Sequence, residues 1–205
     1  MSAAMNVALV GVRCQPVLAT ARLLARAAIV AGLDVALFDA PGPPLPRASA
    51  AVHVRMGEEV RSPIIGAGMA GVLLAFEPLE ALRAAPLLAP GSFVALCEEV
   101  VPTWRMRAGL DARPTDAASR LGALGARVVG VRAEGLLRRS DASPLQGLVL
   151  LGLASALLPI LPGAFEAVLR EDGPAELEAR RAAFSRGRAL FEHLPPHLAV
   201  GASGR

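Results

Sequence analysis

The chain has 205 residues, of which 54% are hydrophobic and only 3% aromatic, so Leu, Val and Ala have to fill its core. All 21 basic residues are Arg, which excludes mechanisms that need a lysine, such as Schiff-base chemistry or a P-loop lysine. The net charge is only +3 and the arginines are dispersed, so we predict no nucleic-acid partner.

The N-terminal segment predicts a strand, a helix and a second strand. An apolar run at Asn6–Val10 precedes helical spacing of apolar residues over Val17–Ala31, and a further apolar run follows at Asp34–Phe38. This order is typical of a crossover in a parallel sheet. The prolines of Ala40–Ala50 exclude a regular element there, and the alternation over Ala51–Val60 predicts a hairpin at the edge of the sheet.

The rest of the chain alternates strands with helices and then becomes helical. The patterns predict strands at 70–76, 91–97 and 127–133, a helix over 77–88, a helix after 113 that is capped by Thr115, and C-terminal helices at 143–158, 162–169 and 174–190. This alternation predicts an α/β fold with an open, doubly wound, mostly parallel sheet, an edge hairpin and a helical C-terminal region. We predict a single domain over residues 1–192 and a flexible tail over 193–205.

One uncharged apolar stretch, "LQGLVLLGLASALLPILPGAF", begins at Leu145. Pro159 and Pro162 interrupt it, so we expect a buried helix and no membrane span. Its apolar positions cover more than the stripe that a surface helix buries. We therefore expect the helical C-terminal region and the loop at residues 43–50 to lie at or near a large, obligate subunit interface. The N-terminal sequence has no basic region before its first apolar run, and a cytoplasmic location is expected.

Four loops follow predicted strands, at Gly11–Pro16, Asp39–Ala50, Phe76–Pro78 and Cys97–Val100. In open α/β sheets, ligands bind at the carboxyl ends of the strands. These loops are therefore the candidate functional face.

The first of these loops reads "GVRCQP" and holds one glycine, Gly11. A phosphate-binding turn needs glycine for positive φ angles and for close approach of the backbone to the anion. Pro16 also lacks an N–H group, although Arg13 offers a positive charge. We favour a structural turn over a phosphate site. Cys14 is either a thiolate activated by Arg13 and the helix start or, as we favour, a small residue that fills the site.

Other polar residues near the predicted sheet have structural interpretations that we favour over functional ones. His53 alternates with Val52 and Val54, so it points to the opposite face, where it bonds either the protein itself or a ligand. Glu77 and Glu80 begin a helix, where acidic residues are favourable. The sequence contains no nucleophile–base set and no metal-ligand set, so we predict no catalytic residue and no metal ligand.

The stretch "HVRMGEEVRSPIIGAGMAGVLLAFEPLEALR" at His53–Arg83 resembles the gamma-type domain of 2-oxoacid:acceptor oxidoreductases, above all the small beta subunits of indolepyruvate ferredoxin oxidoreductases. "LLAPGSFVAL" and "LLGLASALLP" also fit, and the resemblance extends from Asn6 to about Leu190. It implies a Rossmann-like domain that binds a large subunit carrying thiamine diphosphate and iron–sulfur clusters. In that family the large subunit decarboxylates an aryl 2-oxoacid, reduces ferredoxin and forms acyl-CoA. This chain would bind no cofactor alone and would meet ferredoxin and CoA only through the complex.

Two loops depart from the family's pattern. Where the family carries "GVGGQG", this chain has "GVRCQP", and where the family carries "QRGG", this chain has "PRASA". The resemblance therefore implies that the fold and partner binding persist while the small-ligand site has changed. Two alternatives are a repurposed, non-enzymatic α/β binding or scaffold protein and a stand-alone nucleotide-binding enzyme. The residues that we expect to face a ligand or partner are Gly11, Arg13, Cys14, Gln15, Arg47, His53 and Glu77.

Overall fold

The computed structural model describes residues 4–42, 45, 47–132, 144–171 and 174–199. In this part of the chain, six strands form one sheet in the order β2-β3-β1-β4-β5-β6. The strands are β1 (Met5–Val12), β2 (Asp34–Asp39), β3 (Ser49–Gly57), β4 (Ala70–Ala75), β5 (Leu88–Cys97) and β6 (Arg127–Val131). The helices are α1 (Val17–Val30), α2 (Pro78–Arg83), α3 (Trp104–Arg107), α4 (Ala117–Ala123), α5 (Pro144–Ser155), α6 (Pro162–Arg170), α7 (Pro174–Glu192) and α8 (Pro196–Ala199), with a 3₁₀ turn at Ala85–Leu87.

The predicted mostly parallel α/β sheet is confirmed. β1, β4, β5 and β6 run parallel, and β3 is antiparallel to both of its neighbours, β1 and β2. The predicted hairpin within 51–60 is wrong, because residues 49–57 form the single strand β3. The antiparallel hairpin at the edge of the sheet is made by β2 and β3. Residues 58–69 after Gly57 form no strand, because Val60 donates its N–H to the Asp34 carboxylate and the chain turns away from the ladder there.

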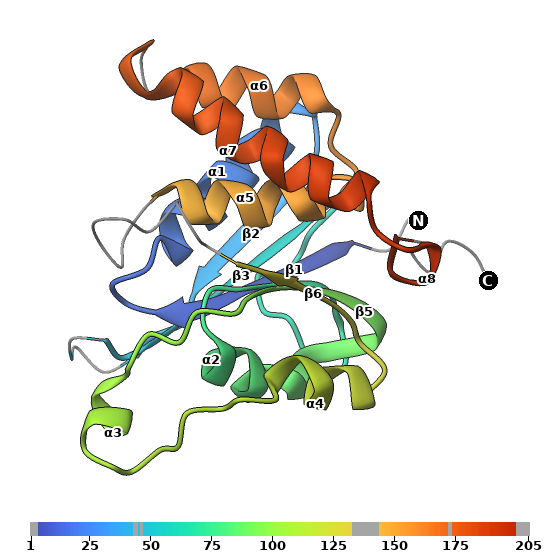
Figure 1. Cartoon of the computed structure of the whole chain (residues 1–205). Coiled ribbons are helices and arrows are strands. Elements are labelled where there is room, and N and C mark those ends of the chain that lie inside the picture. The colour runs from blue at the N-terminus through green and yellow to red at the C-terminus, as the bar shows by residue number, and fades with distance from the viewer. Residues whose placement is uncertain (1–3, 43–44, 46, 133–143, 172–173, 200–205) are drawn as a thin grey trace.

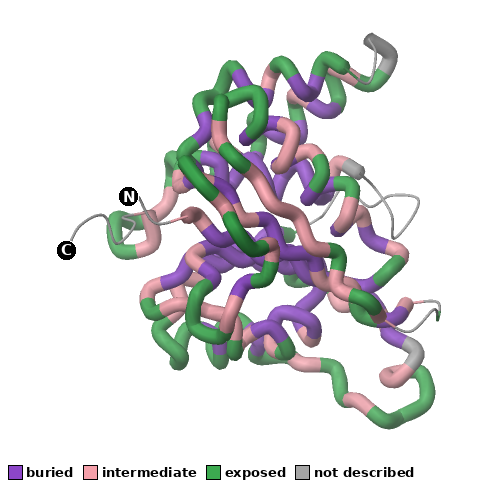
Figure 2. The backbone as a smooth tube through the Cα atoms, turned by 180° about the vertical axis from the view of Figure 1, so that it is seen from behind, coloured by how far each residue is buried: buried purple, intermediate pink, exposed green. Residues whose placement is uncertain are grey.

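Helices cover both faces of the sheet and create two apolar cores (Figure 1). α1, α5, α6 and α7 lie on one face, and the smaller core on the other face is closed by α2 and α4. Figure 2 shows that buried residues are concentrated in the central strands and on the inner sides of the helices. β4 is apolar without alternation because parallel neighbours flank it and both of its faces are covered.

The first helix shows how local sequence fixes an element. Its buried residues recur at the spacing of one helical face, from Val17 through Ala21 and Leu24 to Ala28. The helix ends where Gly32 adopts a φ of +80°. The Leu33 N–H then bonds to the Ala28 carbonyl, as in the Schellman motif, and the chain enters β2.

The structure corrects one predicted cap. α4 begins at Ala117, so Asp116 and not Thr115 occupies the N-cap position, and the side chain of Asp116 makes no cap hydrogen bond. The division into a domain over 1–192 and a tail over 193–205 stays a prediction. Within 193–199 the chain forms α8, and Arg127 donates a hydrogen bond to the Leu198 carbonyl. The predicted strand end at 133, the predicted helix start at 143 and residues 200–205 lie outside the described residues.

The apolar helix α5 is covered by the chain itself, which corrects the expectation that its apolar surface is left open; an interface at the helical C-terminal region and the loop at residues 43–50 stays a prediction. Leu150, Leu151 and Leu153 are fully buried. One side of α5 packs on the sheet, and α7 packs closely across the other. The contact is tight because glycines of the two helices, Gly152 and Gly187, face each other at the crossing. No helix in the described residues has the length and apolar character needed to span a membrane.

Candidate functional site

The connections that leave β1 and β4 diverge, and they mark the site. β1 leads into α1 on one face of the sheet, whereas its parallel neighbour β4 leads into α2 on the other. Such a change of direction is the topological switch point, where open α/β sheets bind ligands. Two predicted loops, Gly11–Pro16 and Phe76–Pro78, therefore meet at this position.

The side chain of Gln15 bridges the ends of these two strands. Its Oε1 accepts the N–H of Val12 at 2.9 Å, and its Nε2 donates to the Phe76 carbonyl at 2.7 Å. Gln15 is buried. Gly11 makes room for it, since a Cβ added at that glycine would lie 2.7 Å from Gln15 Oε1 and 2.9 Å from the Phe76 Cβ. The glycine is needed for packing against Gln15 and not for close approach to an anion.

The backbone N–H groups of the turn also form hydrogen bonds within the protein. Arg13 donates its N–H to the Ala48 carbonyl at 2.9 Å, and Gln15 donates its N–H to Val12 at 2.8 Å. Together with the Val12 N–H, whose acceptor is Gln15 Oε1, three N–H groups of the turn have acceptors within the protein, and Pro16 has no N–H. A phosphate loop presents these groups to its ligand. The geometry therefore favours the structural turn that the sequence predicts.

We expect the isolated chain to bind NAD, FMN and CoA with dissociation constants no tighter than ~1 mM, about −4 kcal/mol, because the donors of the Gly11 turn are already used. Calorimetric titration measures this directly. A micromolar constant that disappears in Arg13→Ala would contradict the expectation, since it would show that the guanidinium leaves its present acceptor, the Gly42 carbonyl at 3.1 Å, to hold an anion.

Three further predicted residues lie near the same edge. Arg13 is exposed and ties the Gly11 turn to the loop after β2 through Gly42. Arg47 in that loop has a φ of +56°, a conformation unusual for a residue with a side chain. Cys14 is half-buried, and Cys97 is buried, which raises the pKa of its thiol. The Nε2 of Gln146 lies 3.0 Å from the Cys97 sulfur.

Glu77 and Glu80 form a buried acidic pair at the start of α2. Glu77 is the N-cap, and its Oε2 accepts the N–H of Glu80 at 2.9 Å. Its Oε1 is buried and has no hydrogen-bond partner in the structure. Burial is the main reason that the pKa of Glu77 is raised to about 7, and burial also raises the pKa of Glu80, against the opposing effect of Arg83. Glu77 therefore titrates near neutral pH.

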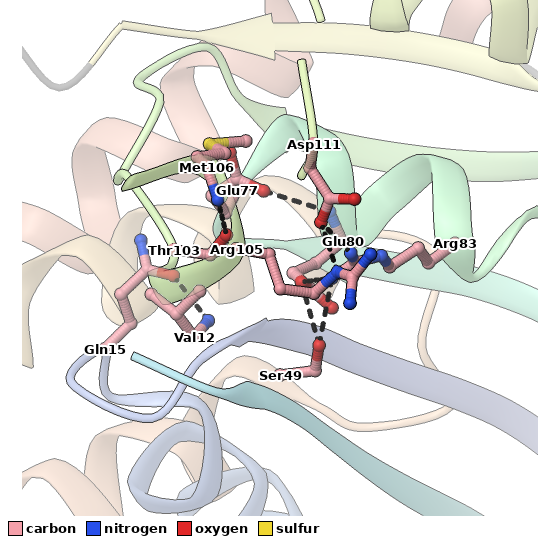
Figure 3. Close-up of polar contacts among 10 residues, drawn as sticks. All are labelled: Val12, Gln15, Ser49, Glu77, Glu80, Arg83, Thr103, Arg105, Met106 and Asp111. Atoms are coloured by element: carbon pink, nitrogen blue, oxygen red, sulfur yellow. Dashed lines mark hydrogen bonds and ion pairs between the residues drawn. The ribbon is translucent and has the colours of Figure 1, made fainter. Parts of the chain in front are cut away.

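Arg83 connects the acidic pair to two other segments of the chain (Figure 3). Its guanidinium lies 2.6 Å from Glu80 Oε1 and 2.6 Å from Asp111 Oδ2, and it donates to the Ser49 hydroxyl at 3.1 Å. Arg105 donates a further bond to Asp111 at 3.0 Å, which is the largest cause of the lowered pKa of Asp111. This network, defined here as Ser49, Glu80, Arg83, Arg105 and Asp111, fastens the segment after β5 to β3 and α2.

Replacing Arg83 with Met should release that segment. The substitution removes the cation shared by Glu80 and Asp111, and because the pairs are partly exposed we expect a loss of about 1–2 kcal/mol in the free energy of unfolding. Limited proteolysis should cut residues 98–116 faster than in the wild type. Arg120→Met, at an exposed position of α4, is the control. Equal cleavage of the two variants would mean that the network does not hold the segment.

His53 lies apart from the other predicted residues. It sits in the middle of β3, opposite Ala8 of β1, and is 8% exposed. Its Nδ1 accepts the N–H of Ile65 at 3.0 Å, and its ring contacts Phe38 with centroids 5.8 Å apart. Burial lowers its pKa, so the neutral ring is favoured, with its proton on Nε2.

Comparison with known proteins now identifies the family. The family model for pyruvate ferredoxin/flavodoxin oxidoreductase matches residues 6–190. The chain belongs to this family. It is 41% identical over 99 residues to the indolepyruvate oxidoreductase subunit IorB of Archaeoglobus fulgidus, which covers 48% of this chain and 49% of the relative. With IorB of Methanothermobacter thermautotrophicus it shares 30% identity over 84% of this chain and 89% of the relative. In the first three relatives the aligned part spans about half of their length.

Solved structures share this fold. A 2-oxoglutarate:ferredoxin oxidoreductase from Magnetococcus marinus matches 95% of this chain with a TM-score of 0.71 and 19% identity, and the match covers 32% of that larger chain. The gamma subunit of a keto/oxoacid ferredoxin oxidoreductase from Geobacter sulfurreducens matches 91% of this chain and 95% of its own with a TM-score of 0.66 and 17% identity. At these identities the likeness establishes the fold.

The structure brings most, but not all, of the predicted residues together at one edge of the family domain. Gly11 lies near the carboxyl end of β1, and the others lie in the loops after β1 and β4 or in the loop before β3: Arg13, Cys14, Gln15, Glu77 and Arg47. Sequence reasoning missed Ser49 and Asp111, because their contacts with Glu80 and Arg83 join positions 28 to 34 residues apart. The i,i+3 pair of Glu80 and Arg83 was the one local signal of this network.

Proposed function

We propose that this chain is the small, non-catalytic subunit of a thiamine-diphosphate-dependent 2-oxoacid:ferredoxin oxidoreductase in the cytoplasm. Its complex acts on indolepyruvate or another arylpyruvate and produces the aryl-acyl-CoA. The observation that carries the proposal is the similarity to an IorB subunit along almost the whole of both chains. The relative's name includes indolepyruvate and calls the protein a subunit, which supports the substrate class and the existence of a partner.

The proposed division of labour gives the chemistry to a larger subunit. That subunit holds the thiamine diphosphate and the iron–sulfur clusters, decarboxylates the 2-oxoacid and passes its electrons to ferredoxin. Among the described residues of this chain, no group of three or more His, Cys, Asp or Glu side chains could hold a metal ion. The turn filled by Gln15 and the network around Arg83 give this chain a fixed surface at the carboxyl edge of its sheet, against which the larger subunit docks.

Reconstitution tests the proposal. The chain is expressed with and without the proposed large, thiamine-diphosphate-binding subunit, and viologen reduction is followed with indolepyruvate, CoA and thiamine diphosphate. We expect no turnover by the 205-residue chain alone, turnover by the pair, and a large loss of activity when the large subunit is assayed without it. Turnover by this chain alone, or equal turnover by the large subunit alone, would contradict the subunit assignment.

The same experiment separates the alternative function. A repurposed binding or scaffold protein would form a stable complex that has no oxidoreductase activity, even with a complete supply of cofactors. The departures from the family pattern in the "GVRCQP" and "PRASA" loops motivate this candidate. Co-purification without turnover, against an active pair from a relative with the glycine-rich loop, would favour it.

A further inference from the structure

The edge strand β2 has one strand neighbour in the described residues, and its outer side is open. It pairs with β3 and ends the sheet. None of its six residues is buried, whereas β1 and β4 are buried almost throughout. An open edge presents a row of unpaired N–H and C=O groups to solvent.

The register of β2 against β3 determines which residues supply that row. Ala40 donates its N–H to Ala51 at 2.9 Å and continues the register that pairs Asp34 with Gly57. In an antiparallel ladder, alternate residues bond to the neighbour and the intervening residues point both backbone groups the other way. Because Ala40 bonds inward, the even-numbered residues of β2 bond to β3. Val35, Leu37 and Asp39 therefore direct their N–H and C=O groups outward.

No device against edge pairing protects the middle of this strand. Its central residues are Val35, Ala36, Leu37 and Phe38, with no charge, proline or bulge among them. Natural edge strands carry such features to avoid pairing with another chain. A row of alternating donors and acceptors is matched by the backbone of another extended strand. The outer edge of β2 is therefore suited to pair with another β-strand.

We propose that the occupant is β2 of a second copy of this chain, paired antiparallel about a two-fold axis at Leu37. The axis sets Leu37 opposite its own copy and Val35 opposite Asp39, so all six outward groups are paired. On the other face of the joined sheet, Ala36 lies opposite Phe38. No aspartate lies directly opposite another aspartate.

The charges and the hydrogen-bond phase select this register. An end-to-end alignment of the two strands would set Asp34 opposite Asp39, which is unfavourable for like charges. It would also set odd-numbered residues opposite even-numbered ones, so outward groups would face groups already bonded to β3. The two-fold axis at Leu37 avoids both faults and gives a closed, isologous dimer.

The helix that packs on β2 adds apolar surface beside the edge. α1 packs against β2 and β3, and at its end Ile29 and Val30 are 62% and 52% exposed. Pairing of the two edges brings the two copies of this helix to the same side of the continuous sheet. The pairing involves neither Gln15 nor the Arg83 network, so it does not depend on the proposed function.

Amide hydrogen exchange in the folded 205-residue chain tests which residues of β2 direct their backbone groups outward. Between micromolar and millimolar concentration, the amides of Val35, Leu37 and Asp39 should slow by about tenfold or more as the dimer fills. The amides of Ala36 and Phe38 should be protected at both concentrations. Sedimentation should show the mass of a dimer over the same range. A monomer whose three outward amides exchange rapidly at millimolar concentration would overturn the proposal. The same result is expected if the edge binds a strand of a different polypeptide and not a second copy.

A disulfide tests the register. In a chain carrying Cys14→Ser, Leu37→Cys should form an intermolecular disulfide with copper phenanthroline, because opposed residues of a bonded pair have Cα atoms about 5.5 Å apart. Ala36→Cys is the matched control, since its copies lie diagonally at roughly 7–8 Å and do not cross-link. Circular dichroism checks that both variants fold. Equal cross-linking of the two, or none in a folded Leu37→Cys chain, would overturn the proposed axis.

Discussion

Gly187→Ala should destabilise the protein by at least ~3 kcal/mol, the upper range for overpacking in a closed core. A Cβ at Gly187 would overlap the Val149 carbonyl oxygen of α5 and lie 2.7 Å from the Leu153 nitrogen. These are backbone atoms, so no side-chain rotation relieves the contact. α7 would have to move away from α5 and expose the apolar helix that it covers.

Thermal and urea unfolding measure this loss, and a matched glycine controls for it. For a chain of this size, such a loss lowers Tm by roughly 6–12 °C. Gly122→Ala is the control, because Gly122 lies inside α4 and an added Cβ meets no atom within 4 Å. This control should be neutral or stabilised by up to about 1 kcal/mol. A Gly187→Ala protein as stable as the wild type would show that the two helices separate without cost.

Glu77→Gln should stabilise the protein at pH 8 by up to about 3 kcal/mol and have little effect at pH 5. Burial raises the pKa of Glu77 from the usual 4.5 to about 7. Between these values the folded state holds a proton that the unfolded state has lost, so stability falls as the pH rises from 4.5 to 7 and stays reduced above it. A neutral Gln keeps the acceptor for the Glu80 N–H and removes the cost of the buried charge.

The measurement is the free energy of unfolding of both proteins from pH 4.5 to pH 8.5. The informative quantity is the difference between the two curves, because all ionisable groups other than Glu77 are the same in both proteins. The difference should grow through the range between the two pKa values and then become constant. A difference that is independent of pH would mean that Glu77 has an ordinary pKa and is hydrated in the folded state.

Local patterns predicted the elements of this fold well. The helical spacing over Val17–Ala31 and the apolar runs that became β1, β2, β4 and β5 depend on side chains close together in sequence. The order of the strands was not accessible in the same way. The alternation in β3 shows that the strand has two different faces, but it carries no information about insertion between β1 and β2.

The candidate site was predictable in place and not in its contacts. The rule that ligands bind at strand ends located the Gly11 and Glu77 loops. The hydrogen bond from Gln15 to Phe76 joins residues 61 positions apart, and no local sequence pattern predicts it. The error over α5 has a similar cause. Periodicity shows how much apolar surface a helix has, but it does not show which element buries that surface. In this protein α7 buries α5, and its small contact residues Ala183 and Gly187 lie between charged residues in the sequence.

The insertion of β3 has a consequence for synthesis on the ribosome. β1 and β2 are consecutive strands in the sequence, but they are not neighbours in the sheet because β3 lies between them. The nascent β1–α1–β2 segment therefore has no sheet of its own to form. Both strands can pair only after β3 (Ser49–Gly57) has been synthesised, and β1 also needs β4 as its second neighbour. Pairing of segments distant in sequence is slow because closing the loop between them costs conformational entropy. Until then, two apolar strands and one helix emerge without partners, which makes this N-terminal part the natural client of a chaperone during translation.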